Sequence, residues 1–167
     1  MSWTAPSEGA AEQVWKWLAA VKDPEIPVLT IADLGILRQV TMDGDQCVVT
    51  ITPTYSGCPA MNTIEQDVLA VLADHDVDAT VETLLHPPWT TDWMSEDGRR
   101  KLEEYGIAPP AETSASKRAI WGDDPTVRCP RCKSEDTRKV SEFGSTACKA
   151  LYQCQDCQEP FDYFKCI

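Results

Sequence analysis

Two Cys-x-x-Cys pairs near the C-terminus constrain this chain more than any other feature of its sequence. The pairs are separated by 21 residues, and their members are Cys129, Cys132, Cys154 and Cys157. Each pair can form a tight knuckle that offers two thiolates, and two knuckles supply the four ligands of a closed tetrahedral site. The sequence therefore predicts a structural zinc ion, although iron can occupy four thiolates in the same arrangement.

The residues around these pairs have the pattern of a small all-β zinc ribbon. Residues 138–143 and 149–153 alternate like strands with a turn between them, and the aromatic segment 161–167 is expected to add a third strand or to form a docking patch. About 40 residues cannot bury enough apolar surface to fold alone, so metal binding is expected to be a condition of folding. Four thiolates leave no open coordination position, which favours a structural over a catalytic metal.

The preceding part of the chain predicts a small mixed β-sheet covered by helices. Helical periodicity predicts two helices, at 10–22 and 59–73. Alternation with a period of two predicts three strands, at 34–41, 47–53 and 77–85. A short charged helix is expected to end at Gly106. The predicted fold class is α+β, followed by the all-β ribbon.

The predicted domain boundaries follow from composition. Residues 109–127 have no periodicity and are rich in the residue types of linkers. We therefore expect an assembly domain with a helical extension at 1–108, a linker at 109–127 and the ribbon at 128–167.

Charge and cysteine usage exclude some classes of function. The net charge is −12, and all of it lies up to Pro110, where 18 acidic residues outnumber 6 basic ones. This surface repels nucleic acid and suits solubility or a basic protein partner. Residues 1–9 lack a signal-peptide pattern and no apolar run approaches a membrane span, so a cytoplasmic location without membrane contact is expected. Eight cysteines in such a chain are more often metal ligands or reactive thiols than disulfides.

Cys58 is the candidate functional thiol of the first domain. It lies between a strand and the helix that starts at Pro59, so its sulfur is expected at the positive end of the helix dipole, which favours thiolate. Gly57 allows a tight turn that leaves the sulfur open to a partner. The alternative is that Cys58 simply fills a cap position, whereas Cys47 alternates with strand residues and is expected in the core.

Two further features have both a functional and a structural interpretation. Asp23, Glu25 and Asp33 lie in a loop with two prolines, which predicts an ordered loop, either near a metal or partner or as a capped, solvated connection. Cys148 lies outside the knuckle pairs and is expected to be a structural thiol, a spare ligand or a reactive thiol.

Several motifs carry a resemblance to known families. Asp-Pro-Glu-Ile-Pro at 23–27, Asp-Leu-Gly at 33–35 and Thr-x-x-Gly-Cys-Pro at 54–59 resemble the iron–sulfur assembly domain of SufT-type proteins. Together with the ribbon, Phe-Gly-Ser-Thr-Ala-Cys-Lys at 143–149 and Glu-Pro-Phe-Asp-Tyr-Phe-Lys at 159–165, nearly the whole chain resembles the PaaD (PaaJ) family. Members of this family are accessory components of phenylacetyl-CoA epoxidase systems.

The resemblance implies an accessory protein of bacterial aerobic phenylacetate catabolism that is not itself an enzyme. The implied partners are a diiron oxygenase that epoxidises the ring of phenylacetyl-CoA and a reductase that carries flavin and a [2Fe–2S] cluster. The implied role is metal-centre assembly or repair, with Cys58 as candidate iron or cluster ligand, Asp23 and Glu25 as the acidic loop, and Cys148 as a weaker candidate. Because a cluster takes about four ligands, a transient iron–sulfur cluster needs others from a second copy in a homodimer, from Cys148 or from a small thiol.

Two other functions remain open from the sequence. A structural component that docks the oxygenase to the reductase would use the ribbon as its adhesive surface and would not need Cys58. A thiol enzyme with Cys58 as nucleophile would need a nearby base, and neither His75 nor His86 lies in a catalytic pattern.

Overall fold

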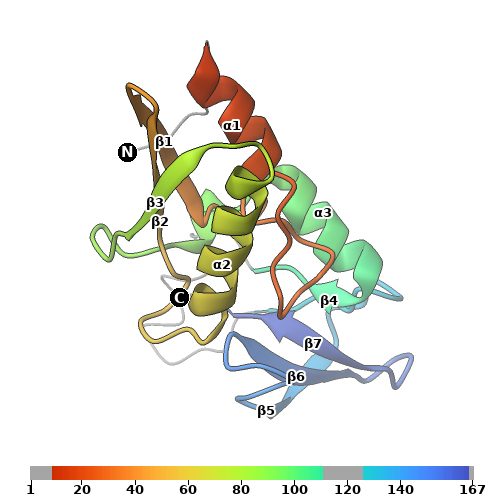
Figure 1. The fold of residues 1–167 in the computed structure, drawn as a ribbon. Coiled ribbons are helices and arrows are strands. Elements are labelled where there is room, and N and C mark those ends of the chain that lie inside the picture. The colour runs from red at the N-terminus through yellow and green to blue at the C-terminus, as the bar shows by residue number, and fades with distance from the viewer. Residues whose placement is uncertain (1–8, 111–125, 166–167) are drawn as a thin grey trace. The chain divides into compact units, whose positions relative to one another are not determined.

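The computed structural model describes residues 9–110 and 126–165, which form two compact units. The first unit contains α1 (Ala10–Leu18), β1 (Leu37–Asp43), β2 (Gln46–Ile51), α2 (Ala60–Ala73) and β3 (Asp78–Thr83). The second contains α3 (Glu96–Tyr105), β4 (Ile107–Ala108), β5 (Thr137–Ser141), β6 (Lys149–Cys154) and β7 (Pro160–Phe164). Figure 1 shows these elements, which confirm an α+β fold followed by a β-ribbon.

The sheet of the first unit is mixed, as predicted. Its strand order is β1-β2-β3, with β1 antiparallel and β3 parallel to β2. Every second side chain of β2 is fully buried, namely Cys47, Val49 and Ile51. Helices α1 and α2 cover this face of the sheet (Figure 1) and contact each other. Cys47 is therefore a core residue, as its alternation predicts.

Helix α1 ends four residues earlier than predicted. The periodic pattern extends to Lys22, but the helix ends at Leu18 because the following backbone pairs with the next loop instead. Lys22 bridges to Thr30, and the N–H of Asp23 donates to the carbonyl of Leu29 at 2.9 Å. The acidic loop is thus paired with the residues that follow the helix, beginning at Val21 and Lys22.

The ribbon unit includes a strand that the sequence pattern did not predict. Its sheet has the order β4-β7-β6-β5, and the two-residue strand β4 pairs in parallel with β7 through Ile107 and Ala108. Helix α3 and β4 therefore group with the ribbon, although we expected them as an extension of the first domain. Most of the expected linker 109–127 lies outside the described residues, but Val127 belongs to the ribbon core.

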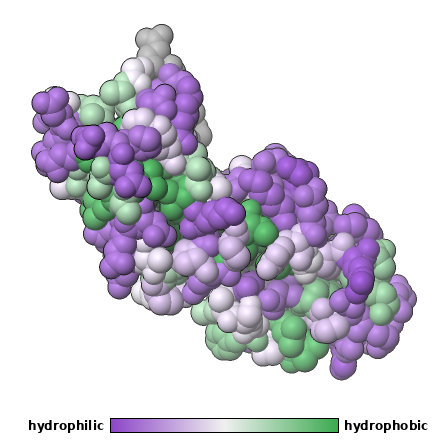
Figure 2. All heavy atoms as spheres, turned by 45° about the vertical axis from the view of Figure 1, so that its right-hand side comes forward, coloured by the Kyte–Doolittle hydropathy of each residue, from purple (hydrophilic) through white to green (hydrophobic). Residues whose placement is uncertain are grey.

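On the face that Figure 2 shows, the surface is predominantly polar. Figure 2 shows one face on which hydrophilic residues dominate and hydrophobic ones form small separate patches. The large apolar side chains most exposed to solvent are scattered in sequence: Leu85, Tyr105, Val140 and Phe143. Among the described residues, no helix combines the length and the hydropathy that crossing a membrane requires.

Gly35 is the position at which the first unit tolerates no side chain. Its φ is +68°, and a Cβ there would lie 2.5 Å from the carbonyl oxygen of Trp93. We expect Gly35→Ala to lower the free energy of unfolding by about 2–4 kcal/mol, since a backbone clash adds to left-handed strain. The measurement is urea unfolding followed by tryptophan fluorescence.

Gly44 provides the matched control. Its φ is +62° but a Cβ there would meet nothing within 4 Å, so Gly44→Ala should cost only about 1 kcal/mol. Equal losses of stability for the two variants would contradict the proposed clash with Trp93.

Candidate functional site

The acidic loop is ordered by its own carboxylates. The Oδ1 atom of Asp23 accepts the backbone N–H groups of Glu25 and Ile26 at 2.9 and 2.7 Å. Asp33 accepts the N–H of Thr30 at 3.0 Å and the hydroxyl of Ser95 at 3.1 Å. Asp23 and Asp33 are both buried, so these bonds satisfy carboxylates that would otherwise be costly to bury. The loop is therefore rigid, as the prolines and carboxylates predict.

Cys58 lies in a tight turn directly before α2. The N–H of Cys58 donates to the carbonyl of Tyr55 at 3.2 Å, and Gly57 adopts φ +81° at the turn. Pro59, rather than Cys58, is the N-cap residue. The side chain of Cys58 is half-buried. Its exposure is greater than that of Cys47 in the core of the sheet and smaller than that of Cys132 and Cys157 in the ribbon.

The structure brings Cys58 close to the acidic loop. Burial raises the pKa of its thiol; a hydrogen bond from the backbone N–H of Ala60 lowers that pKa, and the Glu25 carboxylate raises it again. Smaller contributions come from a hydrogen bond with Tyr55, which lowers the pKa, and from Asp23, which raises it. The net effect is a raised pKa, so the expected preference for thiolate is wrong. The N–H of Ala60, at the start of the helix, does lower the pKa of the thiol as we expected, but burial raises that pKa by more.

Tyr55 is the neighbour of Cys58 that sequence reasoning missed. It lies three residues before the cysteine. Its hydrogen bond with the Cys58 side chain depends on the turn that brings the two residues together. The sequence offered one signal for this contact: a glycine turn between a strand and a helix, since such a turn brings residues i and i+3 together.

The ribbon cysteines form a second candidate site. The four sulfur atoms lie within 4.8 Å of one another, with Cys132 and Cys154 3.5 Å apart and Cys129 and Cys157 3.8 Å apart. A tetrahedron with zinc–sulfur bonds of about 2.3 Å has sulfur atoms about 3.8 Å apart, so the arrangement fits one such ion. Among the described residues, this is the one group of three or more potential ligands at such spacing.

The two knuckles repeat the same backbone design. The N–H of Cys129 donates to the carbonyl of Ser134, and the N–H of Cys154 donates to the carbonyl of Glu159. In both knuckles the acceptor lies five residues after the donor. The fourth residue after each leading cysteine, Lys133 or Gln158, has a positive φ of 67° or 62°. In the second knuckle the N–H of Cys157 points to the sulfur of Cys154 at 3.5 Å and lowers the pKa of that thiol to about 7. The backbone of this knuckle thus favours the thiolate of Cys154.

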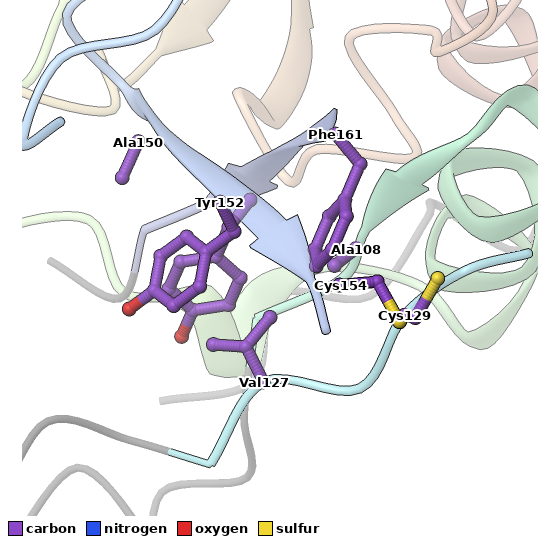
Figure 3. Close-up of a cluster of buried hydrophobic side chains, with 8 residues drawn as sticks. Ala108, Val127, Cys129, Ala150, Tyr152, Cys154 and Phe161 are labelled. Atoms are coloured by element: carbon purple, nitrogen blue, oxygen red, sulfur yellow. The ribbon is translucent and has the colours of Figure 1, made fainter. Parts of the chain in front are cut away.

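The metal site is continuous with the ribbon core. Cys129 and Cys154 belong to the buried cluster drawn in Figure 3, together with Ala108, Val127, Ala150, Tyr152, Phe161 and Tyr163. Figure 3 shows both sulfur atoms at one end of this cluster. Aromatic packing links its members, since Tyr152 lies 6.1 Å from Phe161 and 5.4 Å from Tyr163 between ring centroids.

Cys148 lies in the hairpin before β6 and outside the four-cysteine group. It is buried, and its sulfur lies 3.0 Å from the hydroxyl of Thr146. Asp162 of β7 holds this hairpin: it accepts the Ser145 hydroxyl at 2.9 Å and faces the buried amine of Lys149 at 3.6 Å. A Cβ on Gly144 would collide with the Asp162 carboxylate. The motif at 143–149 therefore has a structural explanation in this hairpin.

Both parts of the chain match known families. Residues 113–165 match the PaaD zinc beta ribbon domain, and residues 11–83 match the iron–sulfur cluster assembly protein family. Over 156 residues the chain is 51% identical to a component of the 1,2-phenylacetyl-CoA epoxidase of Escherichia coli (strain K12), covering 93% of this chain and 92% of that protein.

Other relatives match only the first part of the chain. The Fe-S protein maturation auxiliary factor YitW of Bacillus subtilis (strain 168) is 38% identical over 91 residues, covering 53% of this chain and 88% of that protein. A crystal structure of a domain of unknown function from Bacillus anthracis superposes with a TM-score of 0.51 at 33% identity. It covers 54% of this chain and 88% of that one.

The raised pKa of Cys58 predicts how its alkylation by iodoacetamide depends on pH. Only the thiolate reacts, so the reaction should be slow at pH 7 and rise at a higher pH than for an ordinary cysteine. Glu25→Gln removes a negative charge that raises the pKa, so the profile should shift to lower pH and the rate at pH 8 should rise about threefold. The rate is measured at Cys58 by peptide mass spectrometry.

Glu82→Gln is the matched control for this measurement. Glu82 is an exposed residue of β3 in the same unit, so its loss should leave the profile of Cys58 unchanged. A Glu25→Gln profile that coincides with the wild-type one would contradict the electrostatic coupling.

Loss of one ribbon ligand should unfold the ribbon alone. We expect Cys154→Ser to reduce bound metal from about one ion per chain to a small fraction of that, because the remaining ligands no longer close the site. The amide signals of residues 126–165 should collapse toward random-coil positions in a ¹H–¹⁵N NMR spectrum, while those of the first unit persist. Elemental analysis supplies the metal content.

Cys148→Ser serves as the control because that cysteine is also buried but lies outside the four-cysteine group. It should retain the metal. A folded, metal-free ribbon in the Cys154→Ser variant would contradict the dependence of folding on the metal.

Proposed function

The chain belongs to the PaaD family, and from this membership we propose that it is an accessory component of a 1,2-phenylacetyl-CoA epoxidase that assembles or repairs a metal centre. The related epoxidase component of E. coli covers nearly the whole chain, and relatives named Fe-S protein maturation auxiliary factors cover its first part. The proposed partners are the oxygenase and reductase components, in the cytoplasm. The proposed cargo is iron or an iron–sulfur cluster in transit, not a permanent cofactor.

One observation carries this proposal: the half-buried thiol of Cys58 lies close enough to the carboxylates of Glu25 and Asp23 for their charges to raise its pKa. Thiolate and carboxylate together suit iron, and the negative surroundings favour a cation over an anion. The raised pKa means that binding must release the thiol proton, which makes uptake dependent on pH and reversible. Such a site suits transfer better than permanent storage.

The three residues contribute differently to this proposed site. Cys58 supplies the soft ligand. Asp23 uses one oxygen to hold the loop, so its main proposed role is to shape the site, whereas we assign the half-buried Glu25 as the carboxylate that binds the ion. One thiolate cannot hold a cluster, so a cluster requires ligands from a second copy in a homodimer or from a small thiol. Cys148 is the weakest candidate, because it is buried in the ribbon hairpin.

The ribbon metal has a separate role in this proposal. We assign zinc to Cys129, Cys132, Cys154 and Cys157, where it would supply cross-linking and no redox chemistry. The four thiolates leave it no open position, so the ion holds the ribbon together and does not act on a substrate.

A catalytic role for Cys58 has less support. A thiol nucleophile needs a base beside it. The charged groups that act on Cys58 are carboxylates that favour its protonated form. One of the two histidines, His75, stacks against Trp17 with ring centroids 3.7 Å apart. We therefore propose a non-enzymatic accessory component.

The test is the metal and sulfide content of protein purified without oxygen. We expect about one zinc per chain in wild type and in Cys58→Ala, with iron and sulfide bound after reconstitution by the wild type alone. Cys47→Ala is the control in the same unit, since Cys47 is a thiol buried in the core of the sheet and should not affect the iron and sulfide content.

Two outcomes would overturn the proposal. Equal iron and sulfide in wild type and Cys58→Ala would exclude Cys58 as a ligand. Zinc without iron in either, together with a stable complex of the chain with oxygenase and reductase that survives Cys58→Ala, would support a structural docking component instead.

A further inference from the structure

The four thiols of the ribbon site differ sharply in their access to solvent. Cys129 and Cys154 have no exposed surface, whereas Cys132 and Cys157 are exposed. In each knuckle, therefore, the first cysteine is buried in the ribbon core and the second cysteine is accessible to small reagents. This division does not follow from the Cys-x-x-Cys pattern, which treats the two members of a pair alike.

Two close sulfur contacts run between the knuckles, within a group whose four sulfur atoms all lie within 4.8 Å of one another. Cys132 lies 3.5 Å from Cys154, and Cys157 lies 3.8 Å from Cys129. Each contact thus joins an exposed sulfur of one knuckle to a buried sulfur of the other. An exposed thiolate that is oxidised has a partner thiolate within reach, and that partner is protected from the oxidant itself.

We propose that the ribbon site is a site of reversible oxidation by hydrogen peroxide, with Cys132 and Cys157 as the reacting thiolates and Cys154 and Cys129 as their resolving partners. In the first step, an exposed thiolate attacks one peroxide oxygen. A sulfur–oxygen bond forms, the oxygen–oxygen bond breaks, and hydroxide leaves a sulfenic acid.

In the second step, the buried partner attacks the sulfenic sulfur. A disulfide forms, the sulfur–oxygen bond breaks and a second hydroxide leaves. Two peroxides thus convert four thiolates into two disulfides and four hydroxides, and the divalent ion loses its ligands.

Cross-knuckle disulfides preserve what the metal does for the fold. Cys132–Cys154 and Cys129–Cys157 bonds would keep the two knuckles joined after the ion has left. Disulfides within each Cys-x-x-Cys pair would instead close each knuckle on itself and let the two separate. The two knuckles of the oxidised ribbon therefore remain covalently linked to each other. A thiol reductant plus zinc should restore the original site.

The experiment uses the full zinc-loaded chain, treated with two equivalents of hydrogen peroxide per chain. Zinc release is followed with a chromogenic chelator, and disulfides are mapped by mass spectrometry after alkylation at acid pH. We expect release of the ion with the pairs Cys132–Cys154 and Cys129–Cys157, and recovery with dithiothreitol and zinc. With substoichiometric peroxide, dimedone should label Cys132 and Cys157 about tenfold more than their buried partners.

Two variants with the ribbon ligands intact test selectivity. Cys58→Ala and Cys148→Ala remove thiols outside the site and should release zinc at the wild-type rate. A slower release in either would contradict direct oxidation of the ribbon. Pairs within the knuckles, predominant labelling of Cys129 or Cys154, or zinc retention at two equivalents of peroxide would each overturn the proposal. Because mapping is done on the wild-type chain, none of these last outcomes depends on whether a variant folds.

Discussion

The gathering of four cysteine sulfurs into one group that could hold a metal ion is the feature on which the second half of this protein depends. Two of the four ligands, Cys129 and Cys154, are also members of the buried ribbon cluster, so metal binding and core packing share the same atoms. A ribbon of this size has little other apolar area to offset the entropy of ordering its backbone. An ion held by the four sulfurs would replace that missing area by joining two knuckles that are distant in sequence.

In the first unit, hydrogen bonds rather than clustered cysteines hold the candidate residues in a fixed arrangement. Here backbone hydrogen bonds to Asp23 and Asp33 order the loop between α1 and β1. That loop places carboxylates close enough to act on Cys58, which lies in the turn at Gly57. Burial of the sulfur and the nearby carboxylates of this loop together raise the pKa of its thiol.

Cys154 of the ribbon and Cys58 of the first unit therefore occupy opposite electrostatic environments. A backbone N–H directed at Cys154 lowers its thiol pKa, whereas the pKa values of Cys132 and Cys157 in the same group are raised. At Cys58, burial and neighbouring carboxylates raise the thiol pKa, so a metal must displace a proton to bind. What separates the two proposed sites is the number of thiols: four in the ribbon, which suit a permanent ion, and one at Cys58, which suits passing cargo.

The sequence by itself determined the fold class, the mixed sheet and the identity of the four clustered cysteines, because these follow from local periodicity and from the spacing of rare, strongly coordinating residues. It did not determine that β4 joins the ribbon, since two residues carry no periodic pattern and the strand exists only through pairing with β7. Nor did it determine the protonation of Cys58: the helix terminus is visible in sequence, but burial and the approach of Glu25 arise only when distant segments pack together. Which thiols of the ribbon are exposed was likewise decided by the tertiary structure, because solvent access depends on the core that assembles around each sulfur.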